Sequence, residues 1–181
     1  MEPIKLKPGM MFGTRNPMLL GRLINANQWF WSRDGESTYS HSGIIESSRG
    51  NTYEALWSIK QGHLKAYDGQ KIIVAQYMDL DIQHFREAMI ELKNRHHKQW
   101  YPWWRMPMFL VPPLAKFGTW RGRNVVCSEL VAELLALMGL RHNKYTGTTP
   151  DILADEWRRW QGWKTIEGRL HYEKVNKFFI D

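Results

Sequence analysis

Short stretches rich in apolar and β-branched residues recur through the first half of the chain and predict strands. A Lys7-Pro8-Gly9 turn leads into the first of them. Ser47-Ser48-Arg49-Gly50-Asn51 has the composition of a hairpin turn between two others. The predicted strands cover residues 10–12, 39–45, 52–57 and 71–77. The last of these is the richest in β-branched side chains.

Helical spacing dominates the second half of the chain. Phe85, Met89 and Leu92 repeat at helical intervals within residues 81–99. Asn124 is a good N-cap and Gly139 a natural stop, which predicts a helix between them. Further helices are predicted at residues 17–31, where Asn16 would be the cap, and from Thr149, where Pro150 takes the first helical position and Asp151 follows.

Two remaining segments are less regular. Residues 102–118 contain four prolines among large apolar residues, which predicts a loop or a broken helix. Residues 162–172 predict a final hairpin with its turn near Glu167-Gly168. Because strands come first and helices later, we expect an α+β fold with an antiparallel sheet or small barrel packed against helices. A length of 181 residues fits one domain over residues 1–181.

Composition changes this picture in two ways. The formal net charge of +7 suggests acidic partners such as nucleic acid, anionic lipid or a cell-wall polymer, or a basic surface with no specific ligand. The chain has ten tryptophans, eight of which cluster near residues 29–31, 100–104 and 157–163. Such clusters form membrane-interface belts, sugar- or base-stacking surfaces, or ordinary core packing.

The sequence also bears on the compartment. A single cysteine excludes an intrachain disulfide. No signal peptide is seen at the N-terminus. Residues 17–31 carry Arg22, Asn25, Asn27 and Gln28, so no transmembrane segment is predicted there. These features favour a cytoplasmic location, and the compartment itself is not determined.

Cys127 is the candidate nucleophile. By the Asn124 cap it lies in the first turn of its helix, where free N–H groups and the helix dipole favour a thiolate. The alternative is a small core residue, because Cys127 shares a helical face with Leu130, Val131, Leu134 and Met138.

His41 and Glu54 are candidates for the base and its partner. A strand would hold His41 rigidly, and Glu54 on the next strand could fix its tautomer across a hairpin. The alternatives are a core histidine bonded to backbone and an exposed carboxylate. Paired cysteines, H-E-x-x-H, a phosphate-binding glycine loop and G-x-S-x-G are all missing from the sequence, so we expect no metal, no cofactor and no serine-hydrolase site.

Taken together, these motifs resemble the permuted NlpC-type cysteine peptidases, papain-like hydrolases related to the lecithin:retinol acyltransferase group. The matching motifs are Pro8-Gly9-Met10-Met11-Phe12, with Met10 in place of the usual acid, Ser40-His41-Ser42-Gly43-Ile44-Ile45, Tyr53-Glu54-Ala55, Cys127-Ser128-Glu129-Leu130-Val131 and Thr149-Pro150-Asp151-Ile152-Leu153. Tyr101 matches loosely a tyrosine that helps to hold the oxyanion. The resemblance covers residues 7–154.

The resemblance implies a circularly permuted papain-like fold and a cysteine peptidase or amidase. Cys127 would attack an amide, His41 would act as base, Glu54 would orient His41, and Tyr101 would assist the oxyanion. Peptidoglycan peptides or small amino-acid amides are the implied substrates. Alternatives are lipid acyl transfer or ester hydrolysis, for which the Trp- and Pro-rich residues 100–120 would face lipid, and a catalytically idle module that binds membrane or nucleic acid. No specific nucleic acid is expected.

Overall fold

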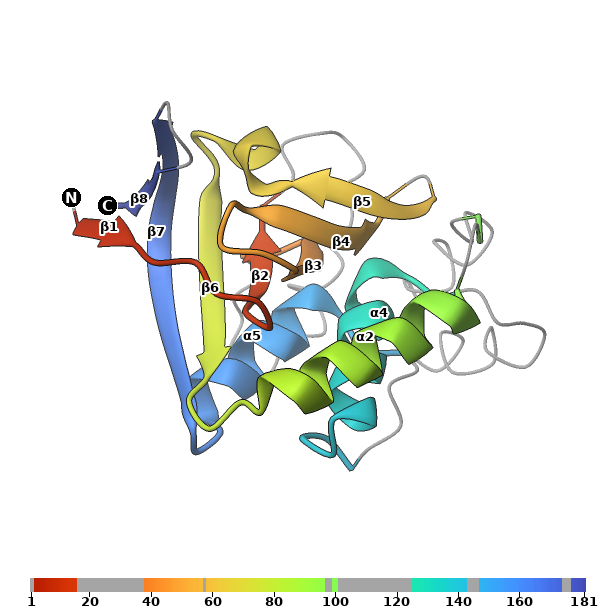
Figure 1. Ribbon diagram of the computed structural model, residues 1–181. Coiled ribbons are helices and arrows are strands. Elements are labelled where there is room, and N and C mark those ends of the chain that lie inside the picture. Colours follow the sequence, from red (N-terminus) through yellow and green to blue (C-terminus); the bar gives the residue numbers. More distant parts are fainter. Residues whose placement is uncertain are drawn as a thin grey trace.

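The protein has an α+β fold, seen here in a computed structural model in which an antiparallel sheet packs against helices (Figure 1). The structure describes residues 2–15, 38–56, 58–96, 99–100, 125–142, 147–173 and 177–181. The elements are β1 (Glu2–Ile4), β2 (Met11–Thr14), β3 (His41–Ile45), β4 (Asn51–Ala55), β5 (Ile59–His63), the 3-10 helix η1 (Leu64–Tyr67), β6 (Lys71–Tyr77), α2 (Ile82–Arg95), α4 (Cys127–Leu137), α5 (Pro150–Arg159), β7 (Trp163–Glu173) and β8 (Lys177–Ile180).

The described strands form one eight-stranded sheet in the order β1-β8-β7-β6-β2-β3-β4-β5. Every described strand pair is antiparallel, and β1 and β5 form the two edges. The sheet curls strongly, so that β4 and β5 run across the direction of β6 and β7 in Figure 1. The antiparallel sheet predicted from the strand pattern is therefore confirmed.

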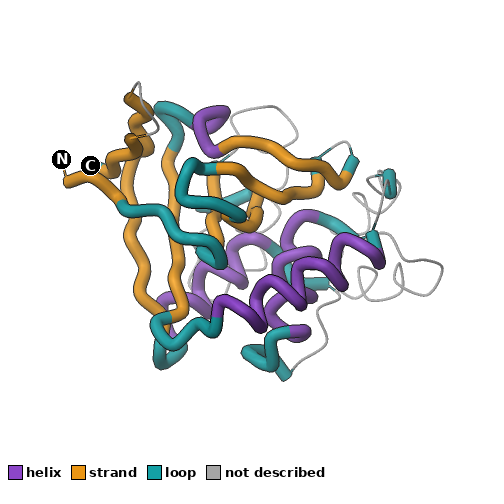
Figure 2. The backbone as a smooth tube through the Cα atoms, in the orientation of Figure 1, coloured by secondary structure: helices purple, strands orange, loops and turns teal. Residues whose placement is uncertain are grey.

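The core is divided by the sheet into two layers. On one face, Ile44, Tyr53 and Ile73 pack against the helices, with α4 over β3 and β4 and α5 over β7 and β2. Figure 2 shows α2, α4 and α5 gathered on this side of the strands, whereas the short helix η1 lies apart from them. On the other face, Phe12 and Tyr67 pack inside the curl of the sheet with residues from β6, β7 and β8. Alternate residues of each inner strand thus serve different layers.

Helix boundaries follow local capping chemistry. Asp81 accepts hydrogen bonds from the N–H groups of Gln83 and His84 and begins α2. Thr149 accepts from Ile152 N–H and begins α5, with Pro150 in the first position, as the sequence predicted. Gly139 follows α4 with a φ of 69°, in the left-handed region that glycine tolerates best.

Two sequence predictions need correction. The cysteine helix begins at Cys127 with Val126 as its N-cap, and Asn124 lies outside the described residues. Residues 162–172 do not form a hairpin, because β7 runs unbroken from Trp163 to Glu173. Gly168 lies within β7, where a Cβ atom would come 1.9 Å from the Asp181 carbonyl oxygen. Its glycine therefore allows close backbone approach rather than a turn.

Other predictions fall outside the described residues, namely the helix at residues 17–31 and the irregular segment at residues 102–118. Among the tryptophans that are described, Trp157 is buried in the helix-side core, whereas Trp100 is 78% exposed. No helix in the described part of the chain is both long enough and apolar enough to cross a membrane.

Candidate active site

The structure brings Cys127, His41 and Glu54 into one hydrogen-bonded cluster. Cys127 is the first residue of α4, His41 the first residue of β3, and Glu54 lies near the end of β4. His41 Nε2 lies 2.7 Å from Glu54 Oε2, and His41 also forms a side-chain hydrogen bond with Cys127. Because Glu54 occupies Nε2, Nδ1 is the ring nitrogen available to the sulfur. The three sequence candidates thus meet in the order thiol, imidazole, carboxylate.

Strand register explains how Glu54 reaches His41. Ile44 of β3 stands opposite Tyr53 of β4, so Gly43 stands opposite Glu54 and His41 is its diagonal neighbour on the same face. At Gly43 a Cβ atom would lie 2.6 Å from Phe12 Cε1 and 3.2 Å from Glu54 Cβ. The glycine of the Ser-His-Ser-Gly motif therefore leaves the space that the diagonal contact crosses.

The electrostatics favour an ion pair between Cys127 and His41. Burial alone would lower the pKa of His41, but hydrogen bonds with Cys127 and Glu54 outweigh it and raise the pKa to about 9. Burial alone would raise the pKa of the Cys127 thiol, but the hydrogen bond and charge of His41, with the backbone N–H groups of Ser42 and Ser128, lower it. Opposite shifts of this kind are typical of a thiolate beside an imidazolium.

Glu54 is a buried carboxylate with several donors, not the exposed strand carboxylate considered as the alternative. It is 2% exposed, and the Thr52 hydroxyl donates to its Oε1 at 2.6 Å. The Tyr67 hydroxyl donates to Oε2, the same oxygen that faces His41. Burial alone would raise the pKa of Glu54, but His41 and the two hydroxyls hold it below its usual range. Glu54 is therefore ionised at neutral pH.

Two residues of this cluster were not predicted from the sequence. Thr52 lies two positions before Glu54, so the period of a strand places both on one face and could have indicated the contact. Tyr67 ends a 3-10 helix and reaches the site from outside the sheet strands, and no sequence signal pointed to it. Tyr101, the predicted oxyanion residue, lies outside the described residues.

Gly62 of β5 makes room for the carboxylate. A Cβ atom there would lie 2.2 Å from Glu54 Oε1 and 2.8 Å from Thr52 Oγ1. Gly62→Ala should therefore displace Glu54 and destabilise the fold by about 1–3 kcal/mol, the usual cost of overpacking. Urea unfolding and the rate of Cys127 alkylation at pH 6 would measure both effects. Gln61→Ala, an exposed neighbour on the same strand, is the control and should change neither, and an unaltered alkylation rate in Gly62→Ala would contradict the close packing.

The cysteine helix is fixed at its first turn by side chains of its own motif. Glu129 Oε2 accepts from Val126 N–H at 3.2 Å, and Oε1 accepts from Gly147 N–H at 2.8 Å. Ser128 Oγ donates to the Thr148 carbonyl at 2.6 Å. The Cys-Ser-Glu triplet therefore places the sulfur and also binds the turn that leads into α5.

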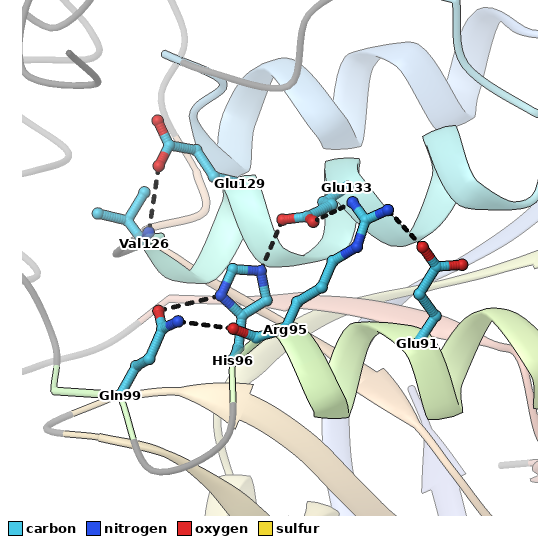
Figure 3. A network of polar contacts seen from close by, with 7 residues as sticks. All are labelled: Glu91, Arg95, His96, Gln99, Val126, Glu129 and Glu133. Carbon is cyan, nitrogen blue, oxygen red and sulfur yellow. Dashed lines mark hydrogen bonds and ion pairs between the residues drawn. The ribbon is translucent and has the colours of Figure 1, made fainter. Parts of the chain in front are cut away.

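A polar network joins α2 to α4 one turn farther along, with His96 and Glu133 buried at its centre (Figure 3). His96 Nε2 lies 2.7 Å from Glu133 Oε2, and Arg95 donates to Glu133 Oε1 at 3.0 Å. Gln99 Nε2 donates to the Arg95 carbonyl, which turns its Oε1 toward His96 Nδ1 at 3.0 Å. Both ring nitrogens thus face acceptors, so the geometry fits a doubly protonated His96 beside an ionised Glu133.

Removing the carboxylate from this network should destabilise the protein. Glu133→Gln removes the buried carboxylate that faces His96 and Arg95, and we expect a loss of about 3–5 kcal/mol in the free energy of unfolding. Glu91→Gln is a matched control, because Glu91 binds the same Arg95 but its side chain is 52% exposed. Chemical denaturation of both variants at pH 7 measures the difference, and equal stabilities would mean that the buried contact contributes nothing.

Comparison with known proteins shows similarity of fold. No family model matches the chain, and no curated protein matches its sequence. Among solved structures, the chain is similar to the metalloprotein YiiX from Escherichia coli O157:H7, with a TM-score of 0.58, 15% identity, and coverage of 90% of this chain and 97% of that one. At this identity the likeness concerns the arrangement of the elements. Among the described residues of our protein, no group of three or more His, Cys, Asp or Glu side chains is placed to hold a metal ion.

Proposed function

We propose that the protein is a cysteine hydrolase of permuted papain-like type, which cleaves an amide through a thioacyl intermediate on Cys127. One observation carries the proposal: a helix-terminal thiol, an imidazole and a buried carboxylate from separate parts of the sequence form one hydrogen-bonded line. A core cysteine or a core histidine bonded to backbone would not need this arrangement. The reaction is built from the same three groups.

The chemistry follows from the ion pair. The Cys127 thiolate attacks the carbonyl carbon, and the first-turn N–H groups of α4 stabilise the negative oxygen that forms. His41 then gives its proton to the leaving amine as the carbon–nitrogen bond breaks. In the second half, His41 takes a proton from water, which attacks the thioester and releases the acid. Glu54 keeps the ring of His41 oriented throughout and stabilises the imidazolium at each step in which His41 carries the proton.

Amides of amino acids or peptides, including peptidoglycan peptides, are the substrate class that we favour, and the net charge of +7 suits an anionic polymer. The thiol route that we propose uses Cys127, His41 and Glu54 and includes no metal step. Lipid ester hydrolysis or acyl transfer is a second candidate, supported by Trp100, which is 78% exposed.

Thiol reactivity tests the proposal directly. The chain has a single cysteine, so incorporation of iodoacetamide measured by mass spectrometry reports Cys127 alone. At pH 6 we expect alkylation about tenfold faster than that of free cysteine, because free cysteine is almost entirely protonated there. Reactivity equal to or below that of free cysteine would leave a core cysteine and a binding module as the better interpretation.

Substrate panels then separate the two candidate classes. Peptide amides hydrolysed in the absence of lipid would support the amidase, with a rate that falls above about pH 9 as the His41 imidazolium loses its proton. Sedimentation with phosphatidylglycerol vesicles and turnover of short-chain lipid esters, without amide cleavage, would support the lipid candidate instead.

A further inference from the structure

Tyr67 contacts two members of the candidate active site at once. Its hydroxyl donates to Glu54 Oε2, and its ring stacks on the imidazole of His41, with centroids 5.7 Å apart and planes inclined by 29°. Phe12 contacts the same imidazole edge-on at 6.1 Å. Phe12 and Tyr67 also contact each other, with centroids 5.3 Å apart, so His41 packs against a pair of aromatic rings and the Tyr67 ring lies along its plane.

Oxygen Oε2 of Glu54 is shared between two donors. His41 Nε2 lies 2.7 Å from it, and the Tyr67 hydroxyl reaches the same atom. The second oxygen, Oε1, accepts from Thr52 and lies against the backbone of β5 at Gly62. A carboxylate that accepts several hydrogen bonds has its charge spread among them and attracts each donor less strongly. Each hydroxyl thus competes with His41 for the charge of Glu54.

His41 and Glu54 interact chiefly with groups from α4, β4 and η1. His41 interacts with Cys127 from α4 and Glu54 from β4, and Tyr67 from η1 lies on its ring. Glu54 interacts with His41, Thr52 and Tyr67. Burial and the charge of Glu54 raise the pKa of Tyr67, so this hydroxyl keeps its proton and acts as a donor.

We propose that Tyr67 is a positioning residue that fixes the ring plane of His41 and, together with Thr52, limits how strongly Glu54 holds the imidazolium. The inference rests on the proposed function, because it gives these hydroxyls a role in the acid strength of His41. A weaker hold leaves the imidazolium better able to release its proton to a leaving amine. The two hydroxyls therefore increase the acid strength of the His41 imidazolium. The Tyr67 ring keeps the imidazole directed at the sulfur of Cys127.

The sign of one titration shift tests the proposal. Tyr67→Phe keeps the ring and removes the hydroxyl, so the charge of Glu54 concentrates on His41 and the titration of His41 should move upward by about 0.5 pH units. Thr52→Val should move it in the same direction, and Thr52→Ser, which restores a hydroxyl, should return it toward the wild-type value. NMR of protein labelled at histidine Cε1 measures the titration of His41 between pH 6 and pH 10.5.

Further variants separate this role from simple packing. Tyr67→Leu removes the stack as well, and we expect a drop of about tenfold or more in Cys127-dependent turnover because a freely turning imidazole is misaligned. Tyr53→Phe is the matched control, since Tyr53 adjoins Glu54 in β4 but packs on the helix side of the sheet. It should change neither the titration nor the rate.

The outcomes distinguish failure of the inference from failure of the function. An unshifted or lowered titration in Tyr67→Phe, beside rapid alkylation of the wild type at pH 6, would overturn the role of the hydroxyl and leave the hydrolase proposal standing. Slow alkylation of the wild type would overturn the function itself. An upward shift in Tyr67→Phe and in Thr52→Val, reversed in Thr52→Ser, would support the inference.

Discussion

Cys127→Ala should abolish formation of a covalent acyl-enzyme while the protein stays folded. The thiol is the nucleophile in the proposed reaction, and loss of a catalytic nucleophile costs at least about a thousandfold in rate. The side chain of Cys127 is small and the residue is 5% exposed, so removal of the sulfur, which leaves a methyl side chain, changes the packing little.

Stopped-flow mixing with p-nitrophenyl acetate gives the most direct measurement. We expect the wild type to show a burst of nitrophenolate equal to one acyl group per chain, with a mass increase located at Cys127, and Cys127→Ala to show none. Circular dichroism and the thermal midpoint verify the fold of the variant. A burst that persists without the thiol would assign the chemistry to another residue and end the hydrolase proposal.

His41→Ala should convert Cys127 into an ordinary buried thiol. The hydrogen bond and charge of His41 are the largest factors that lower the pKa of Cys127, and without them burial raises it. At pH 6 a thiol of ordinary or raised pKa is less than about 1% ionised. Alkylation by iodoacetamide at pH 6 should therefore slow by about a hundredfold, and the rate should recover as the pH rises past 9.

The pH profile of alkylation between pH 5 and pH 10 measures this change. His84→Ala is the matched control, because His84 lies on the exposed face of α2, and its profile should coincide with that of the wild type. If His41→Ala and wild type gave the same profile, the imidazole would not control the thiolate, and helix-terminal N–H groups alone would have to account for any reactivity.

Much of the fold could be predicted because local chemistry marks it. The Thr149-Pro150-Asp151 cap, the β-branched run of β6 and the periodic apolar residues of α2 each carry a signal within a few neighbouring residues. The edge strand β5 escaped prediction because Ile59–His63 has neither alternation nor β-branched enrichment. Its place is determined by pairing with β4, which is a tertiary effect.

The site could be predicted in part for a similar reason. Recognisable local motifs contain Cys127, His41 and Glu54. Their proximity depends on tertiary structure, such as the register of β3 with β4, which the motifs do not determine. The contribution of Tyr67 depends on where η1 lies over the sheet, and a short 3-10 segment gives no such information in its sequence. The prediction of a hairpin at residues 162–172 was wrong because Gly168 leaves room for the backbone of Asp181, which follows β8, and does not form a turn.

The N-terminal end of α5 contacts chain segments next to both His41 and Cys127. Asp151 Oδ1 accepts from Thr38 N–H at 3.0 Å, three residues before the histidine. Thr148 accepts from Ser128, one residue after the cysteine. Residues 148–151 thus connect the chain segment before His41 with the helix that carries Cys127. Directed evolution toward a wider or narrower substrate would therefore find useful changes in residues 148–151. Such changes leave Cys127, His41 and Glu54 themselves intact.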